Sequence, residues 1–366
     1  MESSITIDAR WLLGGIGTYT RHLLRGLQVQ GNGFKIHAIT RSQHADEVRP
    51  WCARMSTVNA SIYTLREQWA IPRAAKGCDL LHVPHYNAPL MERAPLVITI
   101  HDIIHIADPD CQSSFKSWLY ARPVLKAAAR KADHIITVSE FSKAQIVERL
   151  GVPASKVSAI ASGVNGEFLP IDREQALSVV SPALDIDRPY LLYVGNLKRH
   201  KNVATLLEAF TLLREWQDIP QRLLILGDDP RGKRELAEQC RRLGIADRVA
   251  FVPHVRQELL PKIYAAADAL VMPSRLEGFG LPVLEAMACG TPVVCSRAAS
   301  LPEVGGDAAV YFDPHSPEEL ADAIERVLDS QELRENLSAK GLARAKQFTW
   351  DKSVEKHVAI YQAVLE

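Results

Sequence analysis

The chain has 366 residues, enough for two domains of ordinary size, and its 43 basic residues balance its 43 acidic ones. This balance provides no basic surface of the kind that nucleic acids require, so we expect no nucleic-acid partner. The first residues lack the basic segment and apolar run of a signal peptide, and no apolar run reaches the length of a membrane span. We therefore expect a cytoplasmic protein.

Short apolar stretches alternate with longer helical patterns along the chain, which is typical of βαβ units and parallel sheets. In the first half the expected strands are 5–7, 34–40, 80–83, 97–100, 134–138 and 157–160. In the second half they are 190–194, 222–226, 249–251, 269–272, 293–295 and 309–312. The sequence thus predicts an α/β protein made of two similar halves, each a doubly wound parallel sheet.

A stretch rich in proline and charge separates the two halves. It contains Pro170, Pro182 and Pro189 and has no long apolar run. We therefore predict an N-terminal domain over 1–168, a linker over 169–188 and a C-terminal domain over 189–347. The remaining segment, 348–366, has an amphipathic pattern.

Two glutamates, Glu277 and Glu285, flank a glycine-rich turn that leads into a helical run beginning near Pro282. Gly278 and Gly280 leave backbone N–H groups uncovered where the helix dipole is positive, which favours an anion such as a phosphate. Carboxylates repel a phosphate, so these two are expected to accept hydrogen bonds from neutral hydroxyl groups. A phosphate with hydroxyls on both sides describes a nucleotide sugar. An ordinary loop with solvated charges is the alternative.

A second glycine-rich turn follows the first expected strand. Gly15 and Gly17 begin a G-x-G pattern, but Thr20 stands where a dinucleotide site would have its third glycine. The second strand ends at Thr40-Arg41, with no acidic residue for an adenosine ribose, which disfavours a nicotinamide or flavin enzyme. A tight turn without a ligand is one interpretation of these glycines.

Taken together, the motifs resemble the retaining nucleotide-sugar glycosyltransferases of family four. The resemblance covers the chain from end to end through Gly14-Gly15-Ile16-Gly17-Thr18-Tyr19, Ile98-Thr99-Ile100-His101-Asp102, Thr137-Val138-Ser139-Glu140-Phe141-Ser142, Gly163-Val164-Asn165, Tyr193-Val194-Gly195-Asn196 through Lys201-Asn202, and the paired glutamates. It implies a GT-B fold, in which two Rossmann-like domains face each other across a cleft. The N-terminal domain would hold the acceptor and the C-terminal domain the donor. Segment 348–366 would cross back onto the N-terminal domain.

The resemblance also implies roles for individual residues. The expected catalytic residues are His101, which would contact the donor sugar, Lys201, which would contact the diphosphate, and Glu277, which would contact the hexose. Glu285 would bind the ribose. Further donor contacts are expected from Gly15, Gly17, Asn196, Arg199, Val255, Phe279, Gly280 and Leu281. The family normally works without a metal or another cofactor, so we expect none.

One position departs from the family pattern. Many relatives carry an arginine directly after the glycine at 195, whereas this chain has Asn196. Either Arg199 or Lys198 would then supply the second positive charge beside Lys201, and the sequence leaves that choice open. A solvated basic loop is the alternative for these residues.

The implied function is transfer of a hexose from a nucleotide sugar to a glycan or lipid-linked acceptor in cell-surface polysaccharide synthesis. The pattern around 195–202 looks most like bacterial mannosyltransferases that use GDP-mannose. A transferase that uses a UDP-sugar is the first alternative. A GT-B sugar phosphorylase and a non-catalytic nucleotide-binding protein are the others. The acceptor loops are expected at 43–61 and 105–117.

Segment 115–131 combines basic residues with aromatic and aliphatic ones and contains no acidic residue. A helix of this composition is suited to an anionic membrane surface, which suggests peripheral attachment to the inner face of the plasma membrane. The alternative is an ordinary amphipathic helix that covers the first sheet.

Overall fold

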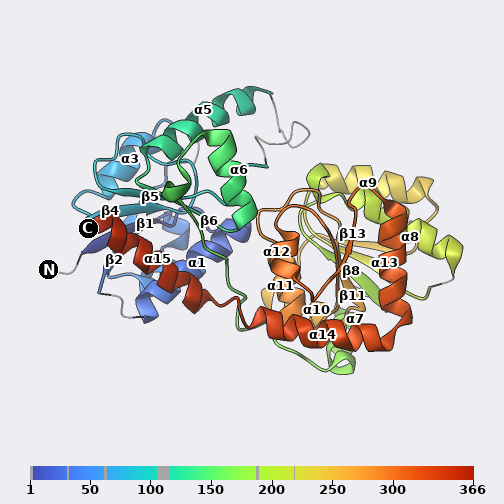
Figure 1. Ribbon diagram of the computed structural model, residues 1–366. Helices are drawn as coiled ribbons and strands as arrows, with labels where there is room; N and C mark the ends of the chain where they lie inside the picture. Colours follow the sequence, from blue (N-terminus) through green and yellow to red (C-terminus); the bar gives the residue numbers. More distant parts are fainter. Residues whose placement is uncertain (1–2, 31–32, 62–63, 105–114, 187–188, 218) are drawn as a thin grey trace. The chain divides into compact units, whose positions relative to one another are not determined.

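The structure is a computed structural model that describes residues 3–30, 33–61, 64–104, 115–186, 189–217 and 219–366, without the side chains of 115–121 (Figure 1). The chain divides into two units. The first consists of Met1–Gly163 together with Thr349–Glu366, and the second of Val164–Phe348. Within the described ranges, no helix is both long enough and apolar enough to cross a membrane.

The first unit contains a parallel sheet in the order β3-β2-β1-β4-β5-β6-β7. Its strands are β1 (Ser4–Asp8), β2 (Lys35–Thr40), β3 (Arg54–Thr57), β4 (Leu80–Val83), β5 (Leu96–Thr99), β6 (His134–Thr137) and β7 (Val157–Ala159). The strands expected in this half are all present. The edge strand β3 lies inside 43–61, which the sequence assigned to an acceptor loop. It escapes detection because its residues are half-exposed rather than apolar.

Helices cover both faces of this sheet. They are α1 (Gly14–Val29), α2 (Ala45–Val48), α3 (Glu67–Ala74), α5 (Phe115–Lys131), α6 (Glu140–Leu150) and α15 (Trp350–Leu365), with short 3₁₀ turns η1 (Ser42–His44), η2 (Arg49–Trp51) and η4 (Ala154–Lys156). Val97 of β5 belongs to the core beneath α1 and α15, and its neighbour Ile98 belongs to the core beneath α3, α5 and α6. Successive strand residues point to opposite faces, so the sheet is doubly wound.

The last helix, α15, packs against α1 although it follows the second unit in sequence (Figure 1). A side chain at Gly26 of α1 would come within 2.5 Å of Val354 on α15, so the glycine is what allows the two helices to approach. Val354 and Tyr361 are buried in the core of the first unit. The final segment is therefore an integral part of that unit's core.

The second unit contains a parallel sheet in the order β10-β9-β8-β11-β12-β13. Its strands are β8 (Tyr190–Val194), β9 (Arg222–Leu226), β10 (Val249–Val252), β11 (Ala269–Met272), β12 (Val293–Ser296) and β13 (Val310–Phe312). Its helices are α7 (Arg173–Leu184), α8 (Val203–Trp216), α9 (Pro230–Arg242), α10 (Leu260–Ala266), α11 (Leu281–Ala288), α12 (Leu301–Gly305), α13 (Pro317–Asp329) and α14 (Gln331–Ala345), with 3₁₀ turns η5 (Arg199–Lys201) and η6 (Gln257–Leu259). The expected strands of this half are present, and the α/β fold with two parallel sheets is confirmed.

The segment 169–188, predicted as a linker, contains α7, which packs on α10 of the second unit. Asp172 caps the helix by accepting the backbone N–H of Gln175 at 2.9 Å, and Pro182 falls in its last turn. The proline content suggested a linker, but a cap and buried contacts outweigh one proline near a helix end. The division between units falls at 163/164 rather than at 168/169.

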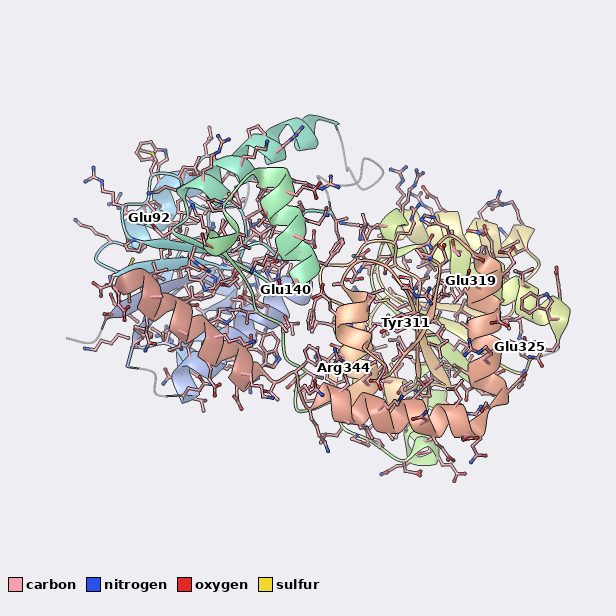
Figure 2. All side chains as sticks on the ribbon, in the orientation of Figure 1. Glu92, Glu140, Tyr311, Glu319, Glu325 and Arg344 are labelled. Atoms are coloured by element: carbon pink, nitrogen blue, oxygen red, sulfur yellow. The ribbon has the colours of Figure 1, made fainter. Side chains whose placement is uncertain are left out.

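Two side chains of the second unit fix the end of α12 (Figure 2). Arg344 of α14 donates to the carbonyl oxygens of Val304 at 2.9 Å and Glu303 at 2.6 Å, and Tyr311 donates to that of Gly306 at 2.8 Å. These bonds satisfy carbonyl groups that a helix end leaves without intrahelical partners. They hold α12 beside the loop that precedes α11.

Candidate functional site

The carboxyl ends of β8 and β9 come unusually close together in the second unit. A side chain at Gly227 would lie 1.8 Å from the carbonyl oxygen of Gly195, so only glycine fits there. Gly195 has a φ of 154° and donates its N–H to Leu226 at 3.0 Å. This contact fixes the start of the basic loop 196–202 at the sheet edge where open α/β sheets bind ligands.

Asn196 shapes this loop. Tyr193 donates its hydroxyl to the carbonyl of Asn196 at 2.6 Å, and the Asn196 side chain accepts the N–H of Lys198 at 3.2 Å. Asn196, Lys198 and Arg199 are exposed, whereas Lys201 retains only 9% of its accessible surface. The side-chain oxygen that stands where relatives carry a cation therefore forms a turn, and Lys201 is the buried cation of the loop.

Asn202 and Arg275 join the basic loop to the segment that follows β11. Asn202 adopts a left-handed conformation with φ 59°, and its amide donates to the carbonyls of Pro273 at 3.1 Å and Pro314 at 2.7 Å. The N–H of Arg275 donates to the carbonyl of His200 at 2.8 Å. These bonds hold Lys201 opposite the residues just after Arg275.

Lys201 forms an ion pair with Glu277. Its Nζ lies 2.6 Å from Glu277 Oε2, and the two side chains are 11% and 13% exposed. The two positions are far apart in sequence and were expected to contact different parts of a donor. In the structure they form one unit, in which each charge is stabilised by the other.

The loop between Glu277 and α11 is rigid for identifiable reasons. Gly280 has a φ of 110°, a conformation that other residues rarely adopt. The hydroxyl of Ser300 lies 2.9 Å from the carbonyl oxygen of Glu277 and 3.0 Å from that of Phe279. Among the described residues, no side chain caps the N-terminus of α11. Pro282 has no N–H and that of Val283 donates to the carbonyl of Gly280 at 3.0 Å, so this helix end is suited to an anion mainly through its dipole. Phe279 and Gly280 are buried, and Leu281 is partly buried.

Glu285 lies on α11 and is bound by a buried tyrosine. Tyr264 of α10 donates its hydroxyl to Glu285 Oε2 at 2.7 Å. Burial raises the pKa of Glu285 to about 7, and the Tyr264 hydrogen bond partly opposes that rise. Because Tyr264 uses only one carboxyl oxygen, the other remains to accept a hydroxyl group. Val255 lies in the loop after β10, half-buried.

Packing and backbone conformation account for most of the glycines in the glycine-rich turn of the first unit. A side chain at Gly17 would lie 2.2 Å from the backbone carbon of Leu12, so Gly17 is required by packing. Gly14 has a positive φ of 60°. A side chain at Gly14 or at Gly15 would meet nothing within 4 Å of the described residues, so both of these glycines border open space.

The hydrogen bond between His101, just after β5, and the carbonyl group of Pro84 determines which nitrogen of the imidazole ring carries the proton. Its Nε2 lies 3.2 Å from the carbonyl oxygen of Pro84, which can only accept, so Nε2 carries the proton and Nδ1 is an acceptor. Burial lowers the pKa of His101, which favours the neutral ring. Asp102 accepts the N–H of Ile104 at 3.0 Å and so stabilises the turn.

A buried hydrogen-bonded chain lies behind His101 and runs from α15 through the sheet and α1 back to α15. Its distances are 2.6 Å from Tyr361 to His82 Nδ1, 2.8 Å from His82 Nε2 to Thr99, 3.0 Å from Thr99 to Tyr19, 2.5 Å from Tyr19 to His357 Nε2 and 2.7 Å from His357 Nδ1 to the carbonyl of Ser353. The ring of Tyr19 meets His101 edge-on, with centroids 4.8 Å apart. The last helix thus supports the residue expected to contact the sugar.

The carbonyl group of Ser353, at one end of this series of hydrogen bonds, determines which atom donates in each of the other bonds. The Ser353 carbonyl only accepts, so His357 donates from Nδ1 and accepts at Nε2 from the Tyr19 hydroxyl. The Tyr19 hydroxyl then accepts a hydrogen bond from the Thr99 hydroxyl, which itself accepts one from His82 Nε2–H. His82 Nδ1 accepts a hydrogen bond from the Tyr361 hydroxyl. Both histidines must be neutral, and burial lowers the pKa of His357 to about 4 and that of His82 well below its ordinary value.

The second unit therefore brings Lys201 and Glu277 together, and it places Glu285 on the helix that begins just beyond them. His101, Gly15 and Gly17 belong to the first unit. Sequence patterns missed three residues that position these groups, namely Tyr264, Arg275 and Ser300, whereas Tyr193 lies in the motif that leads into the basic loop. Each of these three acts through hydrogen bonds to a segment more than twenty positions away in sequence, and none lies in a recognisable motif.

The described part of α5 turns its apolar side inward. Leu125, Ala128 and Ala129 are buried in the first unit's core, while Arg122 and Arg130 are exposed. The side chains of 115–121, which include all the aromatic residues of the membrane prediction, lie outside the described residues. So do residues 105–114 of the second predicted acceptor loop.

Comparison with known proteins agrees with this geometry. Residues 178–344 match the family model described as glycosyl transferases group 1, and residues 13–168 match that of glycosyltransferase family 4. The chain is 34% identical to O-antigen chain mannosyltransferase B of Escherichia coli over 98% of both chains.

Solved structures show the same fold over the full length. Sucrose-phosphate synthase from Thermosynechococcus elongatus has a TM-score of 0.81 at 24% identity and covers 99% of both chains. HepE from Anabaena in complex with UDP and glucose has a TM-score of 0.80 at 19% identity, covering 99% of this chain and 100% of that one. The fold is therefore GT-B, and the chain belongs to the group 1, family 4 glycosyltransferases.

Proposed function

We propose that this glycosyltransferase transfers mannose from GDP-mannose, with retention of anomeric configuration, to a glycan or lipid-linked acceptor. The observation that carries the proposal is the Lys201–Glu277 ion pair beside the uncapped N-terminus of α11. An ammonium group and the positive end of a helix dipole suit a diphosphate, and the carboxylates of Glu277 and Glu285 suit sugar hydroxyls. The similarity to an O-antigen mannosyltransferase supports mannose as the hexose.

The proposed reaction needs no enzyme nucleophile. The bond between the anomeric carbon and the diphosphate oxygen breaks, and the acceptor oxygen bonds to that carbon on the same face. The acceptor's proton passes to the departing phosphate oxygen. Lys201, which uses one of its N–H groups on Glu277, has others to stabilise the charge on the leaving diphosphate. This cation takes the place of a metal, so turnover is expected to survive a chelator.

In the first unit, we assign to His101 the acceptance of a hydrogen bond from a sugar hydroxyl. Its Nδ1 is the nitrogen left to accept, because Nε2 donates to Pro84. Asn196, Arg199, Val255, Phe279, Gly280, Leu281 and the backbone at Gly15 remain proposed donor contacts. Gly17 is explained by its packing against Leu12.

A UDP-sugar is the second candidate donor. The structural neighbour HepE is described in complex with UDP and glucose, and nothing in the loop around Val255 selects between guanine and uracil. The proposed site of action is the cytoplasm. Peripheral attachment through the exposed cations of α5 would bring the enzyme to a lipid-linked acceptor.

A thermal-shift panel with GDP, UDP, ADP and their sugars tests the proposal. A ligand present at a hundredfold excess over its Kd should stabilise the protein by about 2.7 kcal/mol. We expect the largest shift with GDP and GDP-mannose, and a much smaller one for the Lys201→Ala variant. A larger shift with UDP and its sugars would select the second candidate. No shift with any nucleotide would contradict nucleotide-sugar binding altogether.

A further inference from the structure

The chain enters α15 from the second unit through three residues, Phe348, Thr349 and Trp350, here called the return passage. Phe348 is the last residue of the second unit, and Trp350 is the first residue of α15. Between them, the Thr349 hydroxyl accepts the N–H of Lys352 at 3.3 Å and caps the helix. The return passage therefore carries two aromatic rings two residues apart, one in each unit.

The backbone of the return passage lies against the segment by which the chain leaves the first unit, Gly163 and Val164. A side chain at Gly163 would lie 2.2 Å from the backbone nitrogen of Trp350, so only glycine fits there. The N–H of Val164 donates to the carbonyl of Phe348 at 3.1 Å. These contacts hold the backbone of the return passage at both of its ends.

The ring of Phe348 contacts the loop that precedes α11. It meets the ring of Phe279 edge-on, with centroids 6.0 Å apart and planes at 65°, a geometry that aromatic pairs prefer. Phe279 is 7% exposed, so this contact is largely shielded from water. The guanidinium carbon of Arg344 lies 5.4 Å from the centroid of the Phe348 ring and holds it in place. Phe348 thus supports the loop that begins at Glu277.

The ring of Trp350 contacts two rings of α1. It stacks on His22, with centroids 4.6 Å apart and planes 6° from parallel, and it meets Tyr19 edge-on at 6.1 Å. Tyr19 is buried and in turn meets His101 edge-on at 4.8 Å. Trp350 therefore supports His101 through a single intermediate ring.

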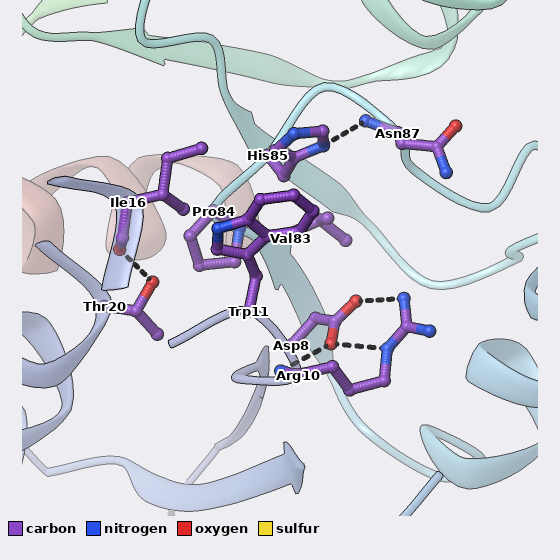
Figure 3. A pocket seen from close by; sticks show the side chains of 9 residues that line it. All are labelled: Asp8, Arg10, Trp11, Ile16, Thr20, Val83, Pro84, His85 and Asn87. Atoms are coloured by element: carbon purple, nitrogen blue, oxygen red, sulfur yellow. Dashed lines mark hydrogen bonds and ion pairs between the residues drawn. The ribbon is translucent and has the colours of Figure 1, made fainter. Parts of the chain in front are cut away.

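Helix α1 also borders the hydrogen-bond partner of His101. The carbonyl of Pro84, 3.2 Å from His101 Nε2, belongs to a residue that lines a small hollow with Ile16 and Thr20 of α1 (Figure 3). The position of α1 consequently affects both the ring of His101 and the group that determines its tautomer. Because Trp350 packs on α1, it acts on both.

We propose that Phe348 and Trp350 are positioning residues for glycosyl transfer, and that the return passage holds the donor loop and His101 in register for the same hexose. The inference rests on the proposed function, in which Glu277 and His101 contact that hexose. Packed side chains carry coupling between distant groups, and here two series of ring contacts end in one three-residue segment. Neither residue contacts the nucleotide, so their loss should act on turnover rather than on nucleotide binding.

The test compares turnover with nucleotide binding in variants of the full-length protein. Turnover is release of nucleotide from GDP-mannose and from UDP-glucose, with water or methyl α-mannoside as the acceptor. Phe348→Ala and Trp350→Ala should each lower kcat about tenfold, the size expected for loss of one aromatic contact, while the thermal shift with GDP or UDP stays that of wild type. Phe348→Tyr and Trp350→Phe keep a ring and should retain most of the turnover. Trp216→Ala, which removes an exposed tryptophan of the second unit, is the matched control.

One glycine inserted between Phe348 and Thr349 tests the register itself. The ring contacts within each unit can remain, but the chain between them lengthens by up to about 3.5 Å. Because a misplacement of about 1 Å can lower a rate a hundredfold, kcat should fall about a hundredfold or more. The thermal shift with the nucleotide should persist.

Wild-type kcat in both alanine variants, or in the insertion variant, overturns the inference and leaves the transferase proposal standing. Loss of nucleotide binding in proportion to turnover also overturns it, because that result marks a purely structural role. If wild type releases no nucleotide from either sugar nucleotide, the proposed function is contradicted and the inference falls with it. If an alanine variant fails to fold, Phe348→Leu or Trp350→Leu replaces it, with the same loss expected.

Discussion

At the scale of single residues, the proposed contact between Glu285 and the ribose of the nucleotide is the most specific assignment. If its carboxylate accepts ribose hydroxyls, Glu285→Gln should weaken GDP binding by about tenfold or more, because a hydrogen bond to a charged group contributes roughly 1.5–3 kcal/mol. Calorimetry on the folded variant measures this directly. Glu332→Gln, an exposed position on α14, is the control. Equal GDP affinity in wild type and Glu285→Gln would remove Glu285 from the nucleotide site.

The raised pKa of Glu285 also predicts how stability depends on pH. Burial raises that pKa from 4.5 to about 7, so between these values the folded chain holds a proton that the unfolded chain has lost. This contribution is fully present below about pH 4.5 and is lost as the pH rises through 7. Urea unfolding should show wild type losing on the order of a few kcal/mol relative to Glu285→Gln across that window. Parallel pH profiles for the two proteins would show that Glu285 titrates normally.

The Lys201–Glu277 pair predicts strong coupling between two positions. Lys201→Met and Glu277→Gln should each destabilise the second unit, because each leaves a largely buried charge without its partner. The double variant should recover part of the loss, with a coupling energy of about 1–3 kcal/mol in a denaturation cycle. Strict additivity would mean that the pair is not formed in solution.

The same variants separate catalysis from folding. Lys201→Met should cut turnover about a hundredfold or more, since it removes a charge that stabilises the leaving diphosphate. The double variant should be as inactive as Lys201→Met while being more stable. Lys198→Met, which changes an exposed lysine of the same loop, should retain activity.

At the scale of elements, the apolar runs were sufficient to locate the strands that build both sheets. They were not sufficient for β3, an edge strand with half-exposed residues, or for α7, because the prolines in and around it suggested a linker. Both are stabilised by contacts with neighbouring segments, which local composition does not record. The same reason explains why Tyr264 and Ser300 were missed, since each positions a site residue more than twenty positions away in sequence.

The series of buried hydrogen bonds that joins α15 to β4, β5 and α1 predicts the tautomers of two histidines. Nitrogen-15 NMR of the imidazole rings at neutral pH should find His357 protonated on Nδ1 and His82 on Nε2, because the Ser353 carbonyl orients every donor between them. Tyr361→Phe removes the donor to His82 Nδ1 and should cost about 1–3 kcal/mol of stability. Reversed tautomers, or charged rings, would contradict the assigned direction of the chain.

At the scale of the whole molecule, sequence motifs were enough to identify the family and the GT-B fold. They placed the paired glutamates and Lys201 in one donor site but assigned them separate partners, because no pattern reveals that Lys201 and Glu277 contact each other. A sequence motif can also assign a ligand-binding role to a residue that packing alone requires. Gly17 looked like a ligand position, yet its close contact with the Leu12 backbone accounts for it.

The most direct test of the account is the anomeric configuration of the product. The full-length protein is incubated with GDP-mannose, in which the mannose is α-linked, and with glycan acceptors in the presence of a chelator. NMR of the new linkage then reports its configuration. We predict an α-linked mannoside whose formation Lys201→Met suppresses. A β-linked product, or transfer that requires a divalent metal, would contradict the proposed mechanism.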